Sequence, residues 1–340
     1  MNNSKTIKDD DPCPCGSGKT YIKCCWIRDA LWEKKEKSRI PFEDLKEATK
    51  EKVFQSREEL QSFTDNMIDR YNREPDEDFL GLSSEQMARL LHFPLEDNAD
   101  IVQLNKDISL QLYEKAPIVR NTQIFLSALA EAGPLKATAK GNLPVKFAKT
   151  LFDEIEDSRF KEWIRFRSEE DSIKVLSLRH ILKIGGWIKK EKKYFKLTRR
   201  GKDLLNKGFS EEHFYRLLLT FTTKFNWSFQ DRYPEFWIIQ GSWLFSLFLL
   251  HKKAKTYTED ITVARDFIKA FPEVALEVDE IYTSAFEYIT RCFSLRFLER
   301  LCEYFGFVKA RRDKQQGPFS ESLFVKTSPF FEKYITWNIQ

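Results

Sequence analysis

The chain has 340 residues, of which 56 are Lys or Arg and 52 are Asp or Glu, so its formal net charge at pH 7 is only +4. Hydrophobic residues make up 42% of the chain and Gly and Pro number 12 each, a composition that excludes disordered, collagen-like and low-complexity proteins and favours helices. The length fits about two domains, and the small net charge neither requires nor excludes a nucleic-acid partner.

The N-terminus reads MNNSKTIKDDDP and contains no apolar segment of the kind that a secretion signal needs. The longest apolar stretch, residues 236–250, is shorter than the ~20 residues of a membrane-spanning helix and includes Gln240 and Ser242. We interpret this stretch as a buried core helix. Together these features predict a cytoplasmic protein without a membrane partner.

Four of the six cysteines lie in the segment DPCPCGSGKTYIKCCW, residues 11–26. Two close pairs of thiolates can build a tetrahedral zinc site, and such clustering favours a bound metal in a reducing compartment over disulfides. Metal binding would supply the folding energy of so small a segment, on the order of 10 kcal/mol. Thiolates also suit iron, so the metal is Zn²⁺ or, alternatively, iron. The pairs flank a Gly-Ser-Gly turn and consist of Cys13 with Cys15 and Cys24 with Cys25.

This segment closely resembles the SEC-C motif, the zinc-binding tail of the preprotein translocase ATPase SecA, which recurs in many otherwise unrelated bacterial proteins. The resemblance rests on the Asp-Pro lead-in, both cysteine pairs, the Gly-Ser-Gly-Lys turn and Tyr21 before the second pair. It implies that all four cysteines are ligands, with Cys25 at a position where the family uses Cys or His. It also implies a protein partner, which is an export chaperone or the ribosome in the SecA case. No helicase-like motor motifs follow the segment.

Three other interpretations of this segment stay open. Gly18-Lys19-Thr20 matches the end of a phosphate-binding loop, but the first glycine of that loop would fall at Cys13 and no hydrophobic strand precedes it. A redox role lacks the usual C-x-x-C spacing. Closed four-thiolate sites are usually structural, so a zinc knob without a partner is the third alternative.

After this zinc knuckle, residues 1–30, the chain is rich in Lys and Glu with scattered apolar residues. Residues 31–75 therefore predict a charged helical arm of one or two amphipathic helices, broken at Pro41. Ser83 is followed three residues later by Gln86, which is a capping box. It predicts a helix that runs to about His92.

Three later segments share one pattern, in which an apolar helix ends at a Gly, β-type residues follow, and a Thr precedes the next helix. In the second and third segments a hairpin fits between Gly and Thr, pairing residues 187–188 with 195–197 and 307–308 with 323–325. Helix, two-stranded wing and closing helix resemble the winged-helix layout, although the first segment is too short for a wing. The segments are residues 125–143, 178–205 and 297–330, with Thr138, Thr198 and Thr327 as candidate caps.

These patterns predict a mainly α fold with small β hairpins. The knuckle and the arm should be followed by a helical body with two or three winged-helix-like units. Residues 76–208 would hold two of them, and residues 209–340 would form an aromatic-rich helical region that ends in the third.

The second wing is strongly basic, with nine Lys or Arg residues against two acids between Lys183 and Asp203. Such a wing could lie along a phosphate backbone, whereas sequence specificity would need base-reading side chains that we do not identify. The alternative is a solvated hairpin tip, where Lys protects an exposed strand edge. The candidate nucleic-acid-binding residues are Lys189, Lys190, Lys192, Lys193, Arg199, Arg200 and Lys202.

The sequence contains no recognisable catalytic constellation. Its four histidines lack metal spacing, neither G-x-S-x-G nor G-x-G-x-x-G occurs, and Cys292 and Cys302 lie in an apolar stretch typical of a core. We therefore predict a non-enzymatic, cytoplasmic bacterial adaptor that docks a protein partner through its zinc knuckle. The alternatives are a DNA- or RNA-binding regulator that uses the basic wing and an enzyme with a site in the aromatic body.

Overall fold

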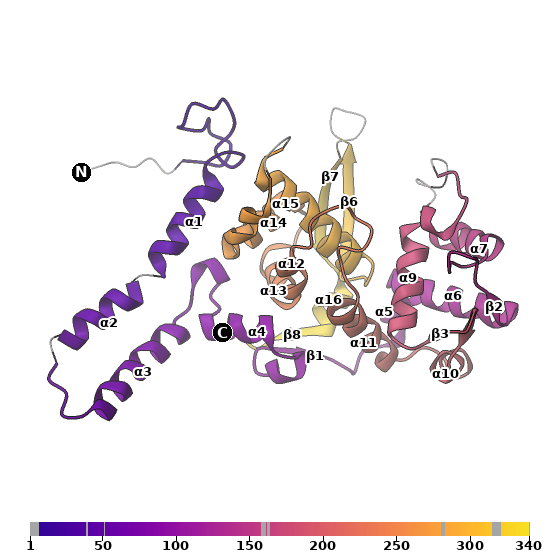
Figure 1. Cartoon of the computed structure of the whole chain (residues 1–340), viewed down its shortest axis with the longest axis horizontal. Helices are drawn as coiled ribbons and strands as arrows, with labels where there is room; N and C mark the ends of the chain where they lie inside the picture. The colour runs from indigo at the N-terminus through magenta and orange to yellow at the C-terminus, as the bar shows by residue number, and fades with distance from the viewer. Residues whose placement is uncertain are drawn as a thin grey trace.

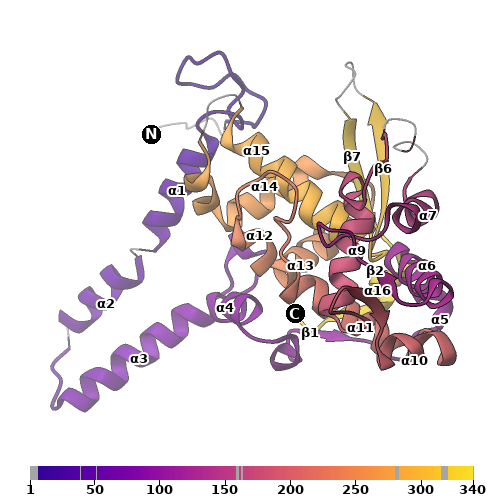
Figure 2. The ribbon, with the colours of Figure 1, turned by 45° about the vertical axis from the view of Figure 1, so that its right-hand side comes forward.

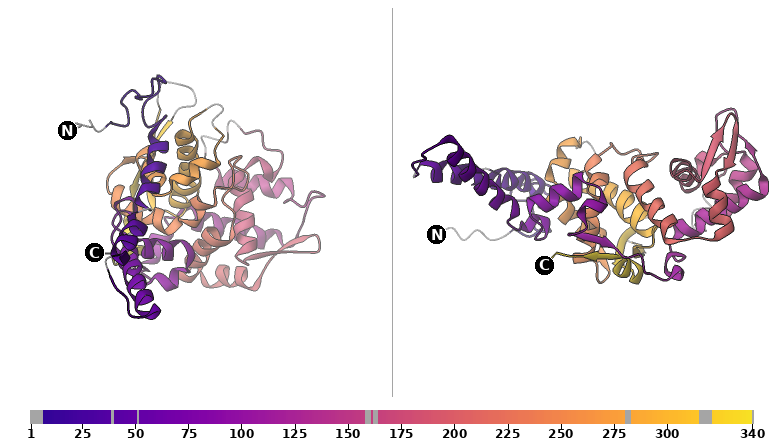
Figure 3. Two further views of the ribbon diagram at one scale, coloured as in Figure 1. Left: turned by 60° about the vertical axis from the view of Figure 1, so that its left-hand side comes forward. Right: turned by 90° about the horizontal axis from the view of Figure 1, so that it is seen from below.

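The computed structural model describes residues 7–38, 40–50, 52–157, 161, 164–279, 283–314 and 321–339. The fold is mainly helical, and the described residues form three small antiparallel sheets, as predicted. An arm of helices extends from a helical body (Figure 1). Seen from below, the arm, the C-terminal part of the body and its earlier part lie in a row, so the molecule is elongated (Figure 3).

The arm is built from three amphipathic helices. The second helix begins at Ile40, which places Pro41 in the first turn, where a missing amide costs little. No side chain of the third helix is buried, and Ser56 caps this helix by accepting a hydrogen bond from the amide of Glu59. The connection between the second and third helices points away from the body (Figure 2). The helices are α1 (Trp26–Lys37), α2 (Ile40–Lys50) and α3 (Arg57–Arg73).

The arm joins the body through the short helix η1 (Glu77–Phe79) and helix α4 (Ser84–His92). The predicted capping box is present: the amide of Gln86 donates to Ser83 Oγ at 3.2 Å, and the amide of Ser83 donates to Gln86 Oε1 at 2.9 Å. The helix ends at His92, as the sequence predicts. Its amphipathic spacing then buries Met87 and Leu90 in the body.

The first unit of the body follows helix η2, strand β1 and helix α5. Its three strands form one sheet in the order β2-β4-β3, and β3 and β4 are the hairpin predicted from the sequence. Ile188 lies opposite Leu197, as expected. The preceding elements are η2 (Leu95–Asn98), β1 (Val102–Leu104) and α5 (Leu110–Tyr113). The unit itself consists of α6 (Pro117–Ala132), β2 (Leu135–Lys136), α7 (Val145–Ile155), η3 (Glu169–Asp171), α9 (Ile173–Ile184), β3 (Ile188–Glu191) and β4 (Tyr194–Leu197).

This sheet corrects the prediction of two separate units in this region. Strand β2 pairs with β4, so residues 125–143 supply the first helix and the edge strand of the unit that residues 178–205 complete. The prediction that Thr138 caps a helix is also wrong. Its side chain accepts a hydrogen bond from the amide of Asn142 within a turn, and α7 begins only at Val145.

The second unit repeats the order of helix, strand, two helices and hairpin. Its sheet has the order β5-β7-β6, which matches β2-β4-β3 strand for strand. Helix α15 continues into the π-helical segment η6, and the two together correspond to α9. The elements are α13 (Trp243–Lys253), β5 (Thr258–Glu259), α14 (Asp260–Ala270), η5 (Pro272–Glu277), α15 (Ala285–Phe293), η6 (Ser294–Glu303), β6 (Val308–Lys314) and β7 (Glu321–Thr327).

The two units also share the junction between helix and hairpin. Gly186 and Gly306 have φ values of 81° and 74°, which favour glycine, and each ends the helix before the hairpin. The hydroxyl of Thr198 donates to the carbonyl of Gly186 at 2.7 Å. The hydroxyl of Ser328 makes the same bond to Gly306, also at 2.7 Å.

Thr198 caps helix α10 (Arg199–Lys207), as the sequence predicts. In the second unit the cap of α16 (Pro329–Tyr334) is Ser328 rather than Thr327, because Thr327 is still part of β7 and donates its amide to Ala254. The register of this hairpin also differs from the prediction.

In the observed register Val308 lies opposite Thr327, so Leu323 to Val325 face Ala310 to Arg312 instead of residues 307–308. The hairpin was predicted from its end residues alone, and its strands are longer than those residues suggested.

Aromatic side chains pack in the region where the two units meet. Phe214 lies between them, with its ring centroid 5.1 Å from that of Tyr113 and 5.2 Å from that of Phe330. The C-terminal strand returns to pair with β1. The connecting elements are α11 (Glu211–Leu219), the π-helical turn η4 (Thr220–Lys224), α12 (Trp237–Gly241) and β8 (Ile335–Trp337).

The apolar stretch 236–250 forms α12 and α13, and all side chains from Trp243 to Leu250 are buried, as predicted. In the part of the chain that the structure describes, no helix combines the length and the apolar character needed to cross a membrane.

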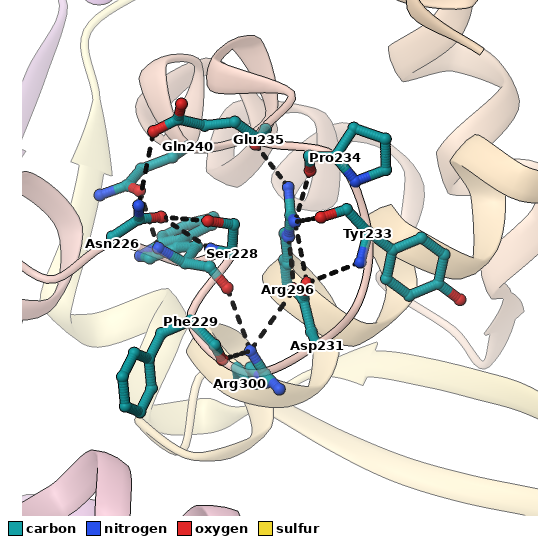
Figure 4. A network of polar contacts seen from close by, with 11 residues as sticks. Asn226, Ser228, Phe229, Asp231, Tyr233, Pro234, Glu235, Gln240, Arg296 and Arg300 are labelled. Atoms are coloured by element: carbon teal, nitrogen blue, oxygen red, sulfur yellow. Dashed lines mark hydrogen bonds and ion pairs between the residues drawn. The ribbon is translucent and has the colours of Figure 1, made fainter. Parts of the chain in front are cut away.

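A buried ion pair fixes the loop of residues 226–236 to η6 (Figure 4). The Asp231 and Arg296 side chains are 0% and 1% exposed, and the Arg296 Nε lies 2.7 Å from the Asp231 Oδ2. The other guanidinium nitrogens of Arg296 donate to loop carbonyls, including those of Glu235 at 2.6 Å and Pro234 at 2.7 Å. Both charges are therefore paired and hydrogen-bonded, as burial demands.

Candidate metal centre

The cysteine segment folds as a turn followed by a helix. Gly16 and Gly18 have φ values of 79° and 74°, which allow the chain to reverse tightly after the first cysteine pair. The amide of Cys13 donates to the carbonyl of Lys19 at 2.9 Å and closes the turn. The second pair comes directly before Trp26, the first residue of α1, so Cys25 lies at the positive end of that helix.

The four sulfur atoms all lie within 4.8 Å of one another. Cys15 Sγ is 3.4 Å from Cys13 Sγ and 3.5 Å from Cys24 Sγ, and Cys24 Sγ is 3.9 Å from Cys25 Sγ. Four sulfurs around a zinc ion at ~2.3 Å are ~3.8 Å apart, whereas a disulfide needs ~2.05 Å. The donor set and its spacing therefore fit a tetrahedral metal. Among the described residues this is the one cluster of three or more potential ligands.

Without a metal, the pKa values of Cys15 and Cys25 differ widely. Hydrogen bonds with Ser17 and Cys13 lower the pKa of Cys15 to about 6, while a hydrogen bond with Cys13 raises the pKa of Cys25 to about 12. Burial also raises the pKa of Cys25. A bound dication reverses this balance and favours four thiolates.

The structure brings together all four cysteines that the sequence predicts as ligands, but sequence reasoning missed Ser17. Its Oγ lies 3.1 Å from Cys24 Sγ, so it contacts the cluster without being a ligand. Its place inside the glycine turn is the signal that could have identified it.

The knuckle packs directly against the second unit of the body (Figure 2). The Trp26 ring meets the Phe286 ring of α15 edge-on, with centroids 5.6 Å apart. Lys23 Nζ lies 2.9 Å from a carboxylate oxygen of Glu287. Sequence reasoning did not foresee this contact, because the two segments lie far apart in the chain.

Docking leaves one side of the knuckle open to solvent. Cys13, Ile22 and Cys25 are buried, while all residues from 14 to 19 are exposed. We call residues 14–19 the knuckle loop. A metal held by the cysteines would fix the shape of this loop, since Cys15 lies within it.

The predicted nucleic-acid-binding residues lie on the β3–β4 hairpin and on α10. Lys192 and Lys193 form the exposed turn, and Arg199 is 95% exposed in its side chain. Two of the other cations make contacts within the unit: Lys190 donates to the carbonyl of Gly141 and Arg200 to that of Gly185, each at 3.2 Å. Lys189 lies 3.5 Å from Glu191, and Lys202 is exposed.

The helix before each hairpin is largely buried. In α9 only Lys183 and Ile184 are exposed, and in α15 and η6 only Arg291 is. Neither helix therefore offers a surface that could enter a major groove, whereas the hairpin and α10 expose basic side chains.

A family model of the SEC-C motif matches residues 11–26, the segment that contains all four cysteines. The resemblance seen in the sequence is thereby confirmed for this segment, and the geometry adds that its cysteines are clustered. No curated protein and no solved structure is significantly similar to the chain.

Proposed function

We propose that the protein is a non-enzymatic adaptor whose zinc-loaded knuckle docks a protein partner. The observation that carries the proposal is the two-sided knuckle: one side is packed on the body through Trp26 and Phe286, and the other presents the exposed knuckle loop. A loop fixed at both ends loses little conformational entropy on binding, which favours recognition.

The proposal includes Zn²⁺ as the metal and a cytoplasmic, bacterial setting. Four closely spaced cysteine sulfurs support zinc because a closed four-thiolate site is typical of structural zinc, and iron is the alternative. The partner class comes from the SEC-C resemblance, which implies an export chaperone or the ribosome. Lys19 on the exposed loop supports a partner with an acidic surface.

The test is affinity capture from lysate of the native host with the full-length protein. The two knuckle variants are Cys13→Ser with Cys15→Ser, which removes two ligands, and Lys19→Glu, which reverses one exposed charge. Lys46→Glu on the exposed face of α2 is the matched control. We expect one partner to be captured by the wild type and the control and lost from both knuckle variants. Equal capture by all four proteins would contradict the adaptor role.

The second candidate function is contact with DNA or RNA through the basic hairpin and α10. The exposure of Lys192, Lys193 and Arg199 supports it, and the element order of both units supports the winged-helix resemblance. Because the helices before the hairpins are buried, this function would rest on phosphate contacts without base readout. Charge reversal at Lys190, Lys192 and Lys193 should then weaken binding to all sequences alike, and each lost phosphate contact should flatten the log–log salt dependence by about 0.9.

A further inference from the structure

A basic cleft of about 500 Å³ opens beside the base of the β6–β7 hairpin, next to α16. Its volume lies within the range of sites for small ligands, roughly 300–1,000 Å³. Three lysines, one tyrosine and one glutamate are among the residues that line it. These residues are Lys255, Lys309, Lys326, Tyr257 and Glu332.

Two of the lysines face each other across the sheet. Lys309 of β6 lies directly opposite Lys326 of β7. Like charges in this position destabilise an antiparallel pair, because the side chains emerge on the same face about 5 Å apart. Within the described residues, neither ammonium group lies within ion-pair distance of a carboxylate.

The acid in the cleft is already engaged. Glu332 lies 2.5 Å from Lys255 Nζ and 3.6 Å from His251 Nδ1. Burial alone would raise the pKa of Glu332, but hydrogen bonds from Lys255 and Thr327 lower it, so the carboxylate is charged at neutral pH. It balances Lys255 and leaves the charges of the facing lysines uncompensated.

In the first unit, a carboxylate of the same hairpin neutralises the corresponding pair of lysines. Lys189 and Lys196 occupy the same register position there, one step inside the hairpin base. Glu191, two residues along the strand, lies 3.5 Å from Lys189 and 2.9 Å from Lys196. The first hairpin therefore carries its own counter-ion.

In the second unit the position of Glu191 is occupied by Arg311, which adds a cation to the same face of the sheet. Its guanidinium lies 5.2 Å from the Tyr257 ring centroid and 4.8 Å from that of Phe324. Asp313 pairs with Arg311 at 3.0 Å, farther along the hairpin. The cleft thus combines facing lysines with an aromatic ring that is 44% exposed.

We propose that this cleft binds a phosphate ester, with the phosphate between Lys309 and Lys326 and the ring of a base or sugar against Tyr257. Lysines act on phosphate as point charges, and exposed aromatic rings serve as stacking platforms for bases. The ligand is either a free nucleotide or a nucleic-acid strand, since both present the same groups. The inference does not depend on the knuckle.

The test uses the full-length protein and three probes: a fluorescent ATP analogue, pyrophosphate as a competitor, and a labelled single strand of about 20 nucleotides. Binding is followed by fluorescence anisotropy. Arg311→Glu gives the second unit the carboxylate of the first, and Lys326→Gln removes one facing charge. The matched control is Lys196→Gln in the first unit.

We expect both cleft variants to weaken binding by at least about tenfold, because Lys326→Gln removes one of the facing charges and Arg311→Glu adds a carboxylate that neutralises them. The control should change binding less than about twofold. Binding of the ATP analogue with displacement by pyrophosphate identifies a free nucleotide, whereas binding of the strand alone identifies a nucleic acid. Absence of binding to all probes, or equal loss in the control, would overturn the proposal. Circular dichroism verifies that each variant is folded.

Discussion

At the scale of single residues, the candidate metal centre consists of four cysteines whose thiolates would repel one another. The low pKa of Cys15, about 6, and the high pKa of Cys25, about 12, show that the cluster without a metal cannot hold four thiolates at neutral pH. The metal is therefore expected to be the main source of stability for the knuckle.

Replacing Cys13 and Cys15 together by Ser should reduce bound zinc from about one ion per chain to near zero, because two ligands cannot complete a tetrahedral site. Zinc content of the purified protein is measured by atomic emission. Cys302→Ala is the control, since this buried thiol lies outside the cluster. A double variant that still carries one zinc would show that the ligands are wrongly assigned.

His180 provides a prediction for acidic pH. Burial, with the charges of Arg179 and Lys183, lowers its pKa to about 4, from 6.5 in the unfolded chain. The unfolded state therefore binds more protons between these values. The stabilisation is complete above pH 6.5 and is lost as the pH falls to about 4, on the order of 2–3 kcal/mol.

His180→Gln removes the titrating group, so the variant should lose less stability than the wild type between pH 7 and pH 4.5. The free energy of unfolding is measured with urea at both values. Parallel losses in the two proteins would rule out this role for His180.

At the scale of elements, the capping box at Ser83 is a feature that local sequence specified correctly. Ser83→Ala should cost about 1 kcal/mol, because it leaves the amide of Gln86 without its acceptor. The neighbouring Ser84 is exposed and caps nothing, so Ser84→Ala should change stability by less than about 0.5 kcal/mol. Urea unfolding compares the two variants, and equal effects would contradict the capping argument.

The buried ion pair between Asp231 and Arg296 should be far more costly to break. Asp231→Ala leaves a guanidinium that is 1% exposed without its counter-ion, which should cost about 3–5 kcal/mol. Asp153→Ala removes an exposed partner of Lys149 and should cost less than about 1 kcal/mol. Similar unfolding free energies for the two variants would mean that the loop is not fixed by this pair.

The elements that sequence reasoning misplaced are those that only tertiary pairing creates. Strand β2 contains two residues, too few to show the alternation of a strand, and it exists because β4 lies beside it. The helix ends at Gly186 and Gly306 were predictable, since glycine there has a local steric reason. The repeat was predicted only in part, because residues 178–205 and 297–330 share a sequence pattern, whereas the helix and edge strand that open each unit share topology alone.

At the scale of the whole molecule, the knuckle is part of the body surface as well as the start of the arm. The cluster of four cysteines could be predicted from spacing along the chain, but the contact between Trp26 and Phe286 joins distant segments and leaves no local pattern. Asp9 and Arg265, 2.8 Å apart, fix the other end of the knuckle to α14. These two contacts fix the knuckle to the second unit.

Removal of the metal should loosen the knuckle and leave the body folded. The body has its own aromatic core, whereas residues 9–26 depend on the metal for most of their folding energy. After treatment with a chelator, hydrogen exchange should rise in residues 9–26 and stay slow in α9 and α15. Unchanged exchange in the knuckle would indicate that packing on Phe286 alone holds it.

The most direct test of the adaptor role is quantitative capture from nuclease-treated lysate with the wild type and with the Cys13→Ser, Cys15→Ser variant, both full length. Nuclease removes proteins that are bridged by nucleic acid, so the comparison isolates direct protein contacts. The account predicts one protein enriched at least about tenfold by the wild type, because the knuckle loop keeps its shape only when the metal is bound. The same captured proteins in equal amounts from both chains would contradict it.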